Sequence, residues 1–243
     1  MKVIGIIPAR MAASRFPGKP LAAICGRPMI EHVYRRSVSA ASMDRVYIAT
    51  PDREIYDAAR RFDAPVIMTS AAHARATDRV AEAAQGLDGD VFINIQGDEP
   101  LLDPAALDLL GAAMRRDATL VCANLVNRID NEADLRNQNQ IKVVCDRQDN
   151  VMYMSRQPVP SSALDKGIGL RQLGVIAFRR EFLATFAALP PTPLEIAESI
   201  DILRALEHGF TVRAVMSPYA SFGVDTPDDL VAAEEALGKV LTS

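Results

Sequence analysis

Short apolar runs alternate with stretches of helical periodicity through the first half of the chain. The apolar runs predict strands at residues 3–8, 45–50, 65–68, 90–96 and 119–126. Between them, the spacing of apolar positions predicts helices at residues 29–40, 52–62, 77–85 and 104–116. In the first helix Ile30, Val33, Tyr34 and Val38 fall on one stripe, and Asp52 is placed to cap the second helix. Strands alternating with helices predict an α/β fold whose strands pair in parallel through right-handed crossovers.

The pattern changes after residue 126. Strand-like runs follow one another with few helical stretches between them, at residues 141–145, 151–153 and 170–178. We therefore expect residues 127–189 to form an antiparallel insertion lobe. The first pattern then returns, with a helix at 194–208 that Gly209 ends, a strand at 211–216 and a closing helix at 227–241. Because no repeat or linker is evident, residues 1–243 are expected to form one domain that carries this lobe.

Composition narrows the class of protein. Hydrophobic residues make up 49% of the 243 residues and there is no Trp, so the core must be built mainly from Ala, Val, Ile and Leu. Cys25, Cys122 and Cys145 are odd in number and lack metal-ligand spacing, which disfavours zinc or a disulfide framework and suits a reducing cytoplasm. No apolar run reaches the length of a membrane span, so no membrane partner is expected. With a net charge of −4 and scattered basic residues, nucleic acid is not the expected partner.

The loop after the first strand carries three cations, Arg10, Arg15 and Lys19. In open α/β sheets, ligands bind outside the carboxyl ends of the strands, so this loop suggests a polyphosphate. It is not a phosphate-binding P-loop, because Ala13 stands at the position of the first Gly and Pro20 replaces the metal-binding Ser or Thr. It also lacks the dinucleotide fingerprint. A solvated basic surface loop is the alternative interpretation.

A second candidate site follows the predicted strand at 90–96, where Gly97, Asp98 and Glu99 come in sequence. Mg²⁺ prefers carboxylate oxygens and keeps its other positions for water and phosphate. Asp98 is the candidate ligand, because Gly97 allows a close approach beside it. By spacing alone, Asp225 is more typical of a helix cap, since Thr226 and a helix follow it.

Short blocks spread over nearly the whole chain, in this order, resemble the 3-deoxy-manno-octulosonate (Kdo) cytidylyltransferase family. The blocks are Pro8-Ala9-Arg10, Ser14-Arg15, Pro17-Gly18-Lys19-Pro20-Leu21, Thr77-Asp78-Arg79, Asn94-Ile95-Gln96-Gly97-Asp98-Glu99-Pro100, Lys142-Val143-Val144, Ser155-Arg156, Pro193-Leu194-Glu195 and Gly223-Val224-Asp225-Thr226-Pro227. The resemblance implies a three-layer, Rossmann-like nucleotidyltransferase fold with a mostly parallel sheet. It implies transfer of CMP from CTP to the anomeric hydroxyl of a Kdo-like 2-keto-3-deoxy sugar acid, with release of pyrophosphate, for lipopolysaccharide or surface polysaccharide synthesis.

The resemblance also assigns roles to residues. Asp98 and Asp225 would hold Mg²⁺ and, with Lys19, form the catalytic set. The nucleotide would contact Ala9, Arg10, Arg15, Lys19 and Pro100. The sugar acid would contact Arg79, Gln96, Arg156, Gln172 and Glu195. Ordinary structural roles compete with two of these, since Arg79 could pair on a helix surface and Glu195 could be an acid of a helix's first turn. A homodimer, with the lobe as its contact, is expected on the same ground.

The chain departs from the family pattern at six positions, most of them on the sugar-acid side. These are Arg75 and Ala76 in place of Ser-Gly, Ser161 in place of an aromatic residue, Gln172 in place of His, Ile176 in place of Tyr and Ile196 in place of Gln. Two alternatives therefore stay open. The acceptor could be a modified ulosonic or a nonulosonic, sialate-like acid, or the chain could be a nucleotide-binding protein on an inactive transferase fold.

Overall fold

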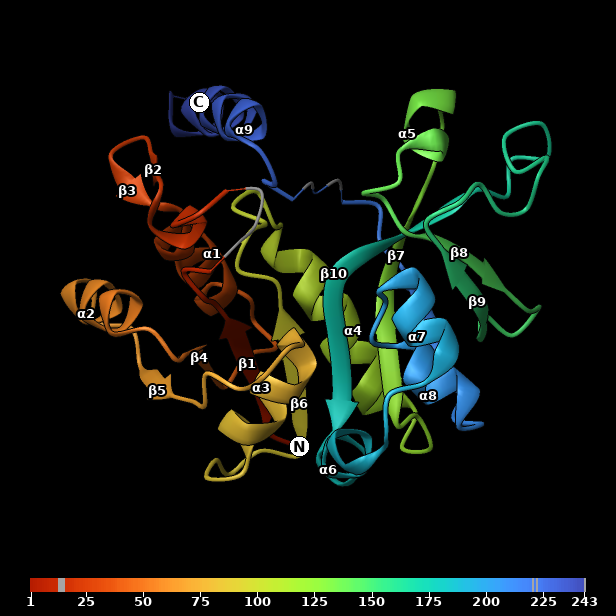
Figure 1. Cartoon of the computed structure of the whole chain (residues 1–243), viewed down its shortest axis with the longest axis horizontal. Helices are drawn as coiled ribbons and strands as arrows, with labels where there is room; N and C mark the ends of the chain where they lie inside the picture. The colour runs from red at the N-terminus through yellow and green to blue at the C-terminus, as the bar shows by residue number, and fades with distance from the viewer. Residues whose placement is uncertain (13–15, 220, 222, 243) are drawn as a thin grey trace.

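A mixed β-sheet forms the centre of the molecule. The computed structural model describes residues 1–12, 16–219, 221 and 223–242. Within these residues, seven strands form the continuous sheet in the order β11-β7-β10-β6-β1-β4-β5 (Figure 1). Their bounds are β1 Val3–Pro8, β4 Arg45–Thr50, β5 Val66–Met68, β6 Val91–Ile95, β7 Cys122–Arg128, β10 Leu170–Arg179 and β11 Val212–Met216.

Parallel pairing dominates this sheet, as the sequence predicts. Strand β1 pairs in parallel with β4 on one side and β6 on the other, and β7 pairs in parallel with β11. Strand β10 is the exception, because it runs antiparallel between β6 and β7. The α/β fold with a mainly parallel sheet is confirmed, and the carboxyl ends of β1, β4 and β6 meet at one edge.

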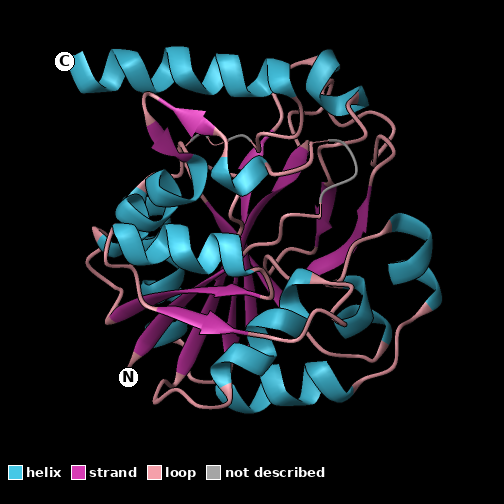
Figure 2. Ribbon diagram, turned by 60° about the vertical axis from the view of Figure 1, so that its left-hand side comes forward, coloured by secondary structure: helices cyan, strands magenta, loops and turns pink. Residues whose placement is uncertain are grey.

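Helices cover both faces of the sheet (Figure 2). In β1, Ile7 packs in the cluster that contains helix side chains from α1, α2 and α4, whereas Ile6 packs with side chains from α3, α6 and α8. A strand buried on both faces has a nearly continuous apolar sequence, which is why β1 shows no alternation with polar residues. The bounds of these helices are α1 Met29–Val38, α2 Arg53–Arg61, α3 Ala76–Ala84, α4 Pro104–Arg116, α6 Arg180–Ala188 and α8 Leu203–Glu207.

The stretch 127–189, expected as an antiparallel lobe, is divided between two environments. Strands β8 (Lys142–Cys145) and β9 (Val151–Ser155) pair antiparallel outside the main strand order, beside the short helix α5 (Glu132–Arg136). Strand β10 pairs with β8 through its first residues, but most of its length lies in the central sheet. The antiparallel extension is therefore smaller than the expected lobe and is continuous with the main sheet.

The prediction of a single helix at 194–208 is wrong. Two short helices replace it, α7 (Pro193–Glu198) and α8, separated by Ser199 in a left-handed conformation with φ of 56°. Ile200 and Ile202 are both buried, and residues two apart on a helix do not share a face. The break allows both side chains to enter the core. Gly209, with φ of 80°, follows α8 as predicted.

The closing helix packs against the hairpin that follows the loop after β1. Helix α9 (Pro227–Thr242) lies at the upper left of Figure 1, near the hairpin of β2 (Ala23–Ile24) and β3 (Arg27–Pro28). Ile24 packs with Ala233 and Leu237 of α9. The short helix η1 (Lys19–Leu21) leads into this hairpin, so Lys19 and the residues just before α9 are brought to the same place.

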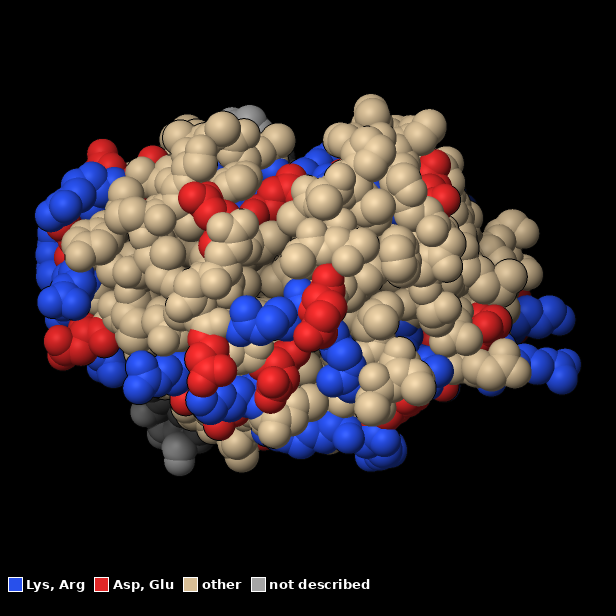
Figure 3. Space-filling view, turned by 90° about the horizontal axis from the view of Figure 1, so that it is seen from below, with Lys and Arg blue, Asp and Glu red and all other residues tan. Residues whose placement is uncertain are grey.

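The opposite end of the molecule carries charges of both signs. Figure 3 shows acidic and basic side chains interspersed on the face that lies below the sheet in Figure 1. An ion pair between Lys2 and Asp88 is one of these contacts. None of the helices in the described part of the chain has both the length and the apolar character needed to cross a membrane.

Candidate active site

The loop after β1 is fixed by backbone contacts to neighbouring elements. Ala9 donates its N–H to Ala49 at the end of β4, over 2.9 Å. Asp52 occupies the cap position of α2, as predicted, but its carboxylate accepts from the Met11 N–H at 2.7 Å rather than from the helix. Gly18, with φ of 73°, donates to the Met11 carbonyl and closes the loop. The loop is therefore held at both ends, with Lys19 directly after its closure.

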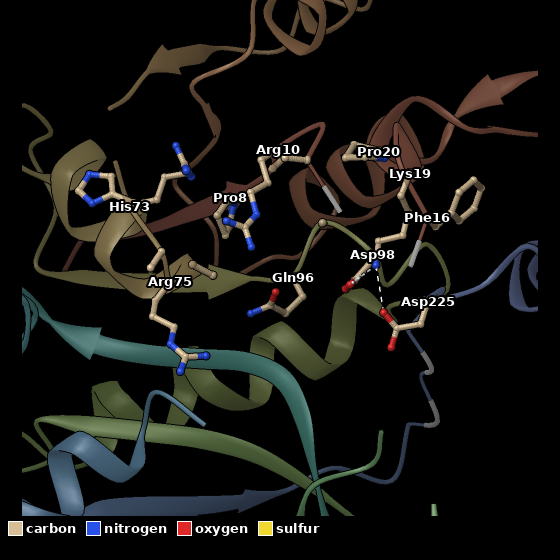
Figure 4. Close-up of a pocket in the computed structure, with 16 residues that line it drawn as sticks. Pro8, Arg10, Phe16, Lys19, Pro20, His73, Arg75, Gln96, Asp98 and Asp225 are labelled. Carbon is tan, nitrogen blue, oxygen red and sulfur yellow. Dashed lines mark hydrogen bonds and ion pairs between the residues drawn. The ribbon is translucent and has the colours of Figure 1, made fainter. Parts of the chain in front are cut away.

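Two carboxylates converge on Lys19. Its Nζ donates to Asp98 Oδ2 at 2.7 Å and to Asp225 Oδ1 at 3.2 Å, across 79 and 206 residues of sequence (Figure 4). The sequence places Lys19 among the phosphate-binding residues and the two aspartates at a metal. The structure brings all three together.

Backbone hydrogen bonds bring Asp225 to Asp98. Val224 donates its N–H to the Asp98 carbonyl oxygen at 2.8 Å. Asp229, in the first turn of α9, accepts from the backbone N–H groups of Asp225 and Thr226 at 2.9 and 2.8 Å. Asp225 thus precedes a helix that another aspartate caps, which leaves the Asp225 carboxylate to face Lys19.

A first cavity of about 300 Å³ lies at the carboxyl ends of β1 and β6. Its polar lining is Arg10, Lys19, His73, Arg75, Arg79, Gln96, Asp98 and Asp225. Ala9 lines it too, whereas Pro100 is buried and lines neither cavity described here. Arg15, the remaining predicted nucleotide residue, lies outside the described residues.

Arg79 lines the first cavity together with Gln96, whereas the predicted sugar-acid residues Arg156 and Gln172 do not. Its Nη1 donates to Thr69 Oγ1 at 2.6 Å and to the Ser70 carbonyl at 3.1 Å. Burial lowers the pKa of the Arg79 guanidinium, and the nearby charge of Arg10 acts in the same direction. Two cations on one side of a cavity are a suitable surface for an anionic ligand.

Two further residues of the first cavity were not predicted as ligand residues. The His73 ring contacts Glu82 through Nε2 at 2.5 Å. Arg75 donates from Nη1 to Ser199 Oγ at 2.8 Å, and in Figure 4 its side chain points away from Lys19. Arg75 was noted in the sequence only because it departs from the family pattern. Nothing in the sequence indicates that α3 contacts the break between α7 and α8.

A second cavity, of about 410 Å³, adjoins the first. Gln96, Asp98 and Asp225 line both cavities. Arg156 and Gln172, two of the predicted sugar-acid residues, line the second. The backbone N–H and Nε of Arg156 donate to Glu198, while its Nη1 donates to the Gln138 carbonyl.

Asn124 positions Gln172 from the neighbouring strand. Gln172 Nε2 donates to Asn124 Oδ1 at 2.6 Å, and Asn124 Nδ2 in turn donates to the Leu173 and Val175 carbonyls at 3.1 and 2.9 Å. These carbonyls lie where the pairing of β10 with β7 shifts register between Gln172 and Ile176. Sequence reasoning missed Asn124, because it lies within an otherwise apolar strand.

Two residues that line the second cavity each have a buried polar atom without a hydrogen-bond partner among the described residues. These atoms are Nε of Arg171 and Oε1 of Gln140. Nearby, the fully buried Lys142 donates to the Asn137 and Gln140 carbonyls, and burial lowers the pKa of its ammonium group. Gln140, Arg156, Arg171 and Gln172 all line this cavity, and their polar side chains suit a ligand with several hydroxyl or carboxyl oxygens.

Glu99 links three segments around the second cavity. Its Oε1 accepts from the Gly174 N–H and its Oε2 accepts from Ser221 Oγ, both at 2.8 Å. Burial raises the pKa of Glu99, while the hydrogen bond from Ser221 opposes the shift.

Glu195 forms a buried ion pair that joins two helices. It is buried against Arg204, with Nε–Oε2 and Nη2–Oε1 distances of 2.8 and 2.6 Å, and Arg204 also contacts Asp78 at 3.1 Å. Glu195 lines neither cavity and instead joins α7 to α8. The interpretation of Glu195 as a first-turn acid fits this placement, whereas contact with the sugar acid does not.

Comparison with known proteins decides the family. Residues 4–214 match the sequence profile of a family described as cytidylyltransferase. The chain belongs to the cytidylyltransferase family. This cytidylyltransferase is 43% identical to the 3-deoxy-manno-octulosonate cytidylyltransferase of Geobacter metallireducens, over 98% of this chain and 99% of the relative. It is 45% identical to the protein of the same name from Syntrophobacter fumaroxidans, over 98% and 100% of the two chains.

Solved structures agree with the sequence comparison. The structure of a CMP:2-keto-3-deoxy-manno-octonic acid synthetase complexed with CTP is similar to this cytidylyltransferase, with a TM-score of 0.92 and 36% identity over 98% of this chain and 99% of that chain. A 4-diphosphocytidyl-2C-methyl-D-erythritol synthase from Anaerococcus prevotii shares the fold, with a TM-score of 0.64 and 15% identity over 98% and 99% of the two chains. The family resemblance drawn from the sequence blocks is confirmed.

Proposed function

We propose that this protein transfers CMP from CTP to the anomeric hydroxyl of 3-deoxy-manno-octulosonate and releases pyrophosphate, in the synthesis of a bacterial lipopolysaccharide or surface polysaccharide. One observation carries the proposal. The two cavities meet at Gln96, Asp98 and Asp225, so a nucleotide in one and a sugar acid in the other would approach each other at the two carboxylates.

Magnesium fits this junction. Asp98 and Asp225 each place an oxygen on the same cation, the Lys19 ammonium group, and carboxylate oxygens are the protein ligands that Mg²⁺ prefers. Among the described residues, no cluster of three or more His, Cys, Asp or Glu side chains offers a complete metal site, so water and phosphate would supply the other ligands. When bound, Mg²⁺ would neutralise phosphate charge and lower the pKa of a coordinated hydroxyl group.

The protein's own groups supply binding and orientation. In the first cavity, Arg10 and Arg79 face the position proposed for the triphosphate, and Lys19 can leave the carboxylates to join them. In the second cavity, Arg156, Arg171 and Gln172 supply charged and polar side chains for the acid. Nucleotidyl transfer needs little covalent chemistry from the protein, and positioning with charge stabilisation supplies most of the acceleration.

The test is release of pyrophosphate from CTP. The proposal predicts release that requires both Mg²⁺ and Kdo. CTP binding without any release, under conditions where the protein is folded, would instead support a nucleotide-binding protein on an inactive transferase fold.

A related acid is the second candidate acceptor. Gln172 and Ile176, which stand where the family pattern has His and Tyr, both line the second cavity. A panel of 2-keto-3-deoxy acids, including a nonulosonic acid, tests this candidate through the kcat/KM of each. Strict preference for Kdo would exclude it.

We also propose a cytoplasmic homodimer. Cys25, Cys122 and Cys145 are free thiols, which suits a reducing compartment. For the dimer, Met152 of β9 exposes 63% of its surface on the antiparallel extension, where the contact is expected. Sedimentation of the wild type and of Met152→Lys tests this: the variant should shift toward the monomer, and a monomeric wild type would refute the dimer.

A further inference from the structure

Glu99 is buried beside the second cavity, directly after Asp98. Only 7% of its surface is exposed, and both carboxyl oxygens accept a hydrogen bond from the protein. Oε1 accepts from the Gly174 backbone N–H and Oε2 accepts from the Ser221 hydroxyl, each at 2.8 Å.

These two bonds connect the segments that form the junction of the cavities. Gly174 lies in the register shift of β10, beside Gln172, and Gln96 donates its N–H to the Gly174 carbonyl at 3.1 Å. Ser221 precedes Asp225 in the segment that Val224 ties to Asp98. Glu99 therefore holds the loop that carries Asp98 between the strand that lines the second cavity and the segment that carries Asp225.

The backbone at Gly174 is shaped for this contact. A Cβ atom at this position would lie 2.4 Å from Glu99 Oε1 and 2.5 Å from Gln96 Cγ. Separations under 3 Å require a shift of one partner, so a side chain at position 174 would displace Glu99 or Gln96 from its present place. The absence of a side chain at Gly174 allows its N–H to reach the carboxylate.

We propose that Glu99 is a positioning residue of this enzyme, which sets the separation of Asp98, Asp225 and the second-cavity wall through its two hydrogen bonds, and is not itself a metal ligand. This proposal rests on the proposed function, because the separation affects catalysis only if CTP and the acid bind in the two cavities. The rival role is a third carboxylate at the metal. In the structure, the carboxylates that share the Lys19 cation are those of Asp98 and Asp225, while Glu99 faces Gly174 and Ser221.

The conservative variant distinguishes the two roles. In Glu99→Gln, the amide has the same shape, its oxygen can accept from Gly174 and its NH₂ can donate to Ser221 Oγ. We expect kcat and the KM for the acid to stay within about threefold of the wild type, whereas Glu99→Ala, which leaves the buried Gly174 N–H without a partner, should raise that KM by about tenfold or more. The KM for CTP should change less than the KM for the acid in both variants.

Two readouts do not depend on turnover. Amide hydrogen exchange at Gly174 should accelerate in Glu99→Ala and stay near the wild-type rate in Glu99→Gln. Binding of Mn²⁺, followed by its paramagnetic signal in the presence of CTP, should be unchanged by Glu99→Gln and lost in Asp98→Asn.

Two serine variants control for a general loss of packing. Ser221→Ala removes one of the two bonds and should raise the KM for the acid, whereas Ser42→Ala alters a buried hydroxyl that has no partner among the described residues and should not. The serine pair and Glu99→Gln keep the test informative if Glu99→Ala fails to fold.

Equal loss of Mn²⁺ binding in Glu99→Gln and Asp98→Asn would overturn the proposal and make Glu99 a metal ligand. Unchanged exchange at Gly174 in Glu99→Ala would also overturn it. A wild type that folds but releases no pyrophosphate would refute the proposed function alone, since the exchange measurement on Gly174 would still stand.

Discussion

The two cavities differ in how the chain builds them. The first cavity is lined largely by residues that follow β1 and β6, such as Arg10 and Asp98, so two loops at one sheet edge supply much of its chemistry. The second is assembled from distant parts of the chain, such as Gln140, Arg156 and Gln172, none of which follows a parallel strand of the core. Both cavities use Asp98 and Asp225. Under the proposed function, the nucleotide would bind where loops at one sheet edge gather, and the acid would bind where distant segments meet.

The largest expected effect comes from the two shared carboxylates. Asp98→Asn and Asp225→Asn should each lower turnover by about a thousandfold, at the upper end of the loss seen when charge stabilisation is removed from a transition state. The melting temperature should change little. Steady-state kinetics at saturating Mg²⁺ measure the effect, and Asp228→Asn, an exposed neighbour on α9, is the matched control. Near-normal turnover in either variant would contradict the claim that both carboxylates act in the reaction.

Lys19 provides the next largest effect. In Lys19→Gln the two carboxylates lose their shared ammonium group and the proposed triphosphate loses a cation, so turnover should fall by about a hundredfold. Lys19→Arg, which keeps the charge with a different shape, should retain more activity than Lys19→Gln. If both variants lost activity equally, shape rather than charge would be the property that matters at this position.

A variant at Glu195 distinguishes a residue that binds the sugar acid from one that stabilises the fold. Removing one partner of a buried ion pair is strongly destabilising, so Glu195→Gln should lower the free energy of unfolding by about 3 kcal/mol. Activity per folded molecule should stay near the wild-type value, because Glu195 lines neither cavity. Denaturant unfolding and active-site titration test this together. A raised KM for the sugar acid with unchanged stability would return Glu195 to the acceptor site.

The ion pair between Glu195 and Arg204 should also make the free energy of unfolding depend on pH. Burial opposes ionisation, but the hydrogen bonds and charge of Arg204 outweigh it and lower the pKa of Glu195 below its usual 4.5. A carboxyl with a lowered folded-state pKa contributes stability above its unfolded pKa and loses it as the pH falls through the folded value. The stability difference between the wild type and Glu195→Gln should therefore be constant near neutral pH and shrink below pH 4.5. A difference that persisted unchanged at lower pH would contradict the ion pair.

The smallest expected effect concerns Arg75, at the boundary between the cavities. Its guanidinium holds Ser199, which lines the second cavity, although Arg75 itself lines the first. Arg75→Ser should raise the KM for the sugar acid by about threefold, in line with a partly exposed contact, and leave the KM for CTP unchanged. Arg75→Lys, which keeps a donor, is the comparison variant. A change confined to the KM for CTP would place Arg75 with the nucleotide.

The sequence predicts the first half of the fold better than the second. Buried parallel strands such as β1 and β6 have short apolar runs between amphipathic helices, and this pattern is local. The apolar run that becomes β10 predicts a strand equally well, but its position between β6 and β7 depends on pairing with distant residues. The break at Ser199 escaped prediction for a similar reason, because it depends on burial of Ile200 and Ile202 and on contacts with α3.

The residues of the candidate site also differ in how well the sequence predicts them. Arg10, Lys19 and Asp98 are found from a strand followed by a charged loop, which is a physical signal in the sequence. Asp225 is found only through the family resemblance, since its approach to Asp98 depends on a backbone bond from Val224. Motifs do not identify every role. Asn124 belongs to no motif, yet it positions Gln172 from an apolar strand. Glu195 belongs to a motif, yet it stabilises the fold through Arg204.

The central claim is that the two cavities form one reaction site for CTP and a 2-keto-3-deoxy acid. Phosphorus NMR of the wild type with CTP, Kdo and Mg²⁺ tests it most directly. The account predicts one pyrophosphate for each new phosphodiester between CMP and the sugar, and neither product when Kdo is left out. Pyrophosphate formed together with free CMP, or CTP that is bound and stays intact, would contradict it.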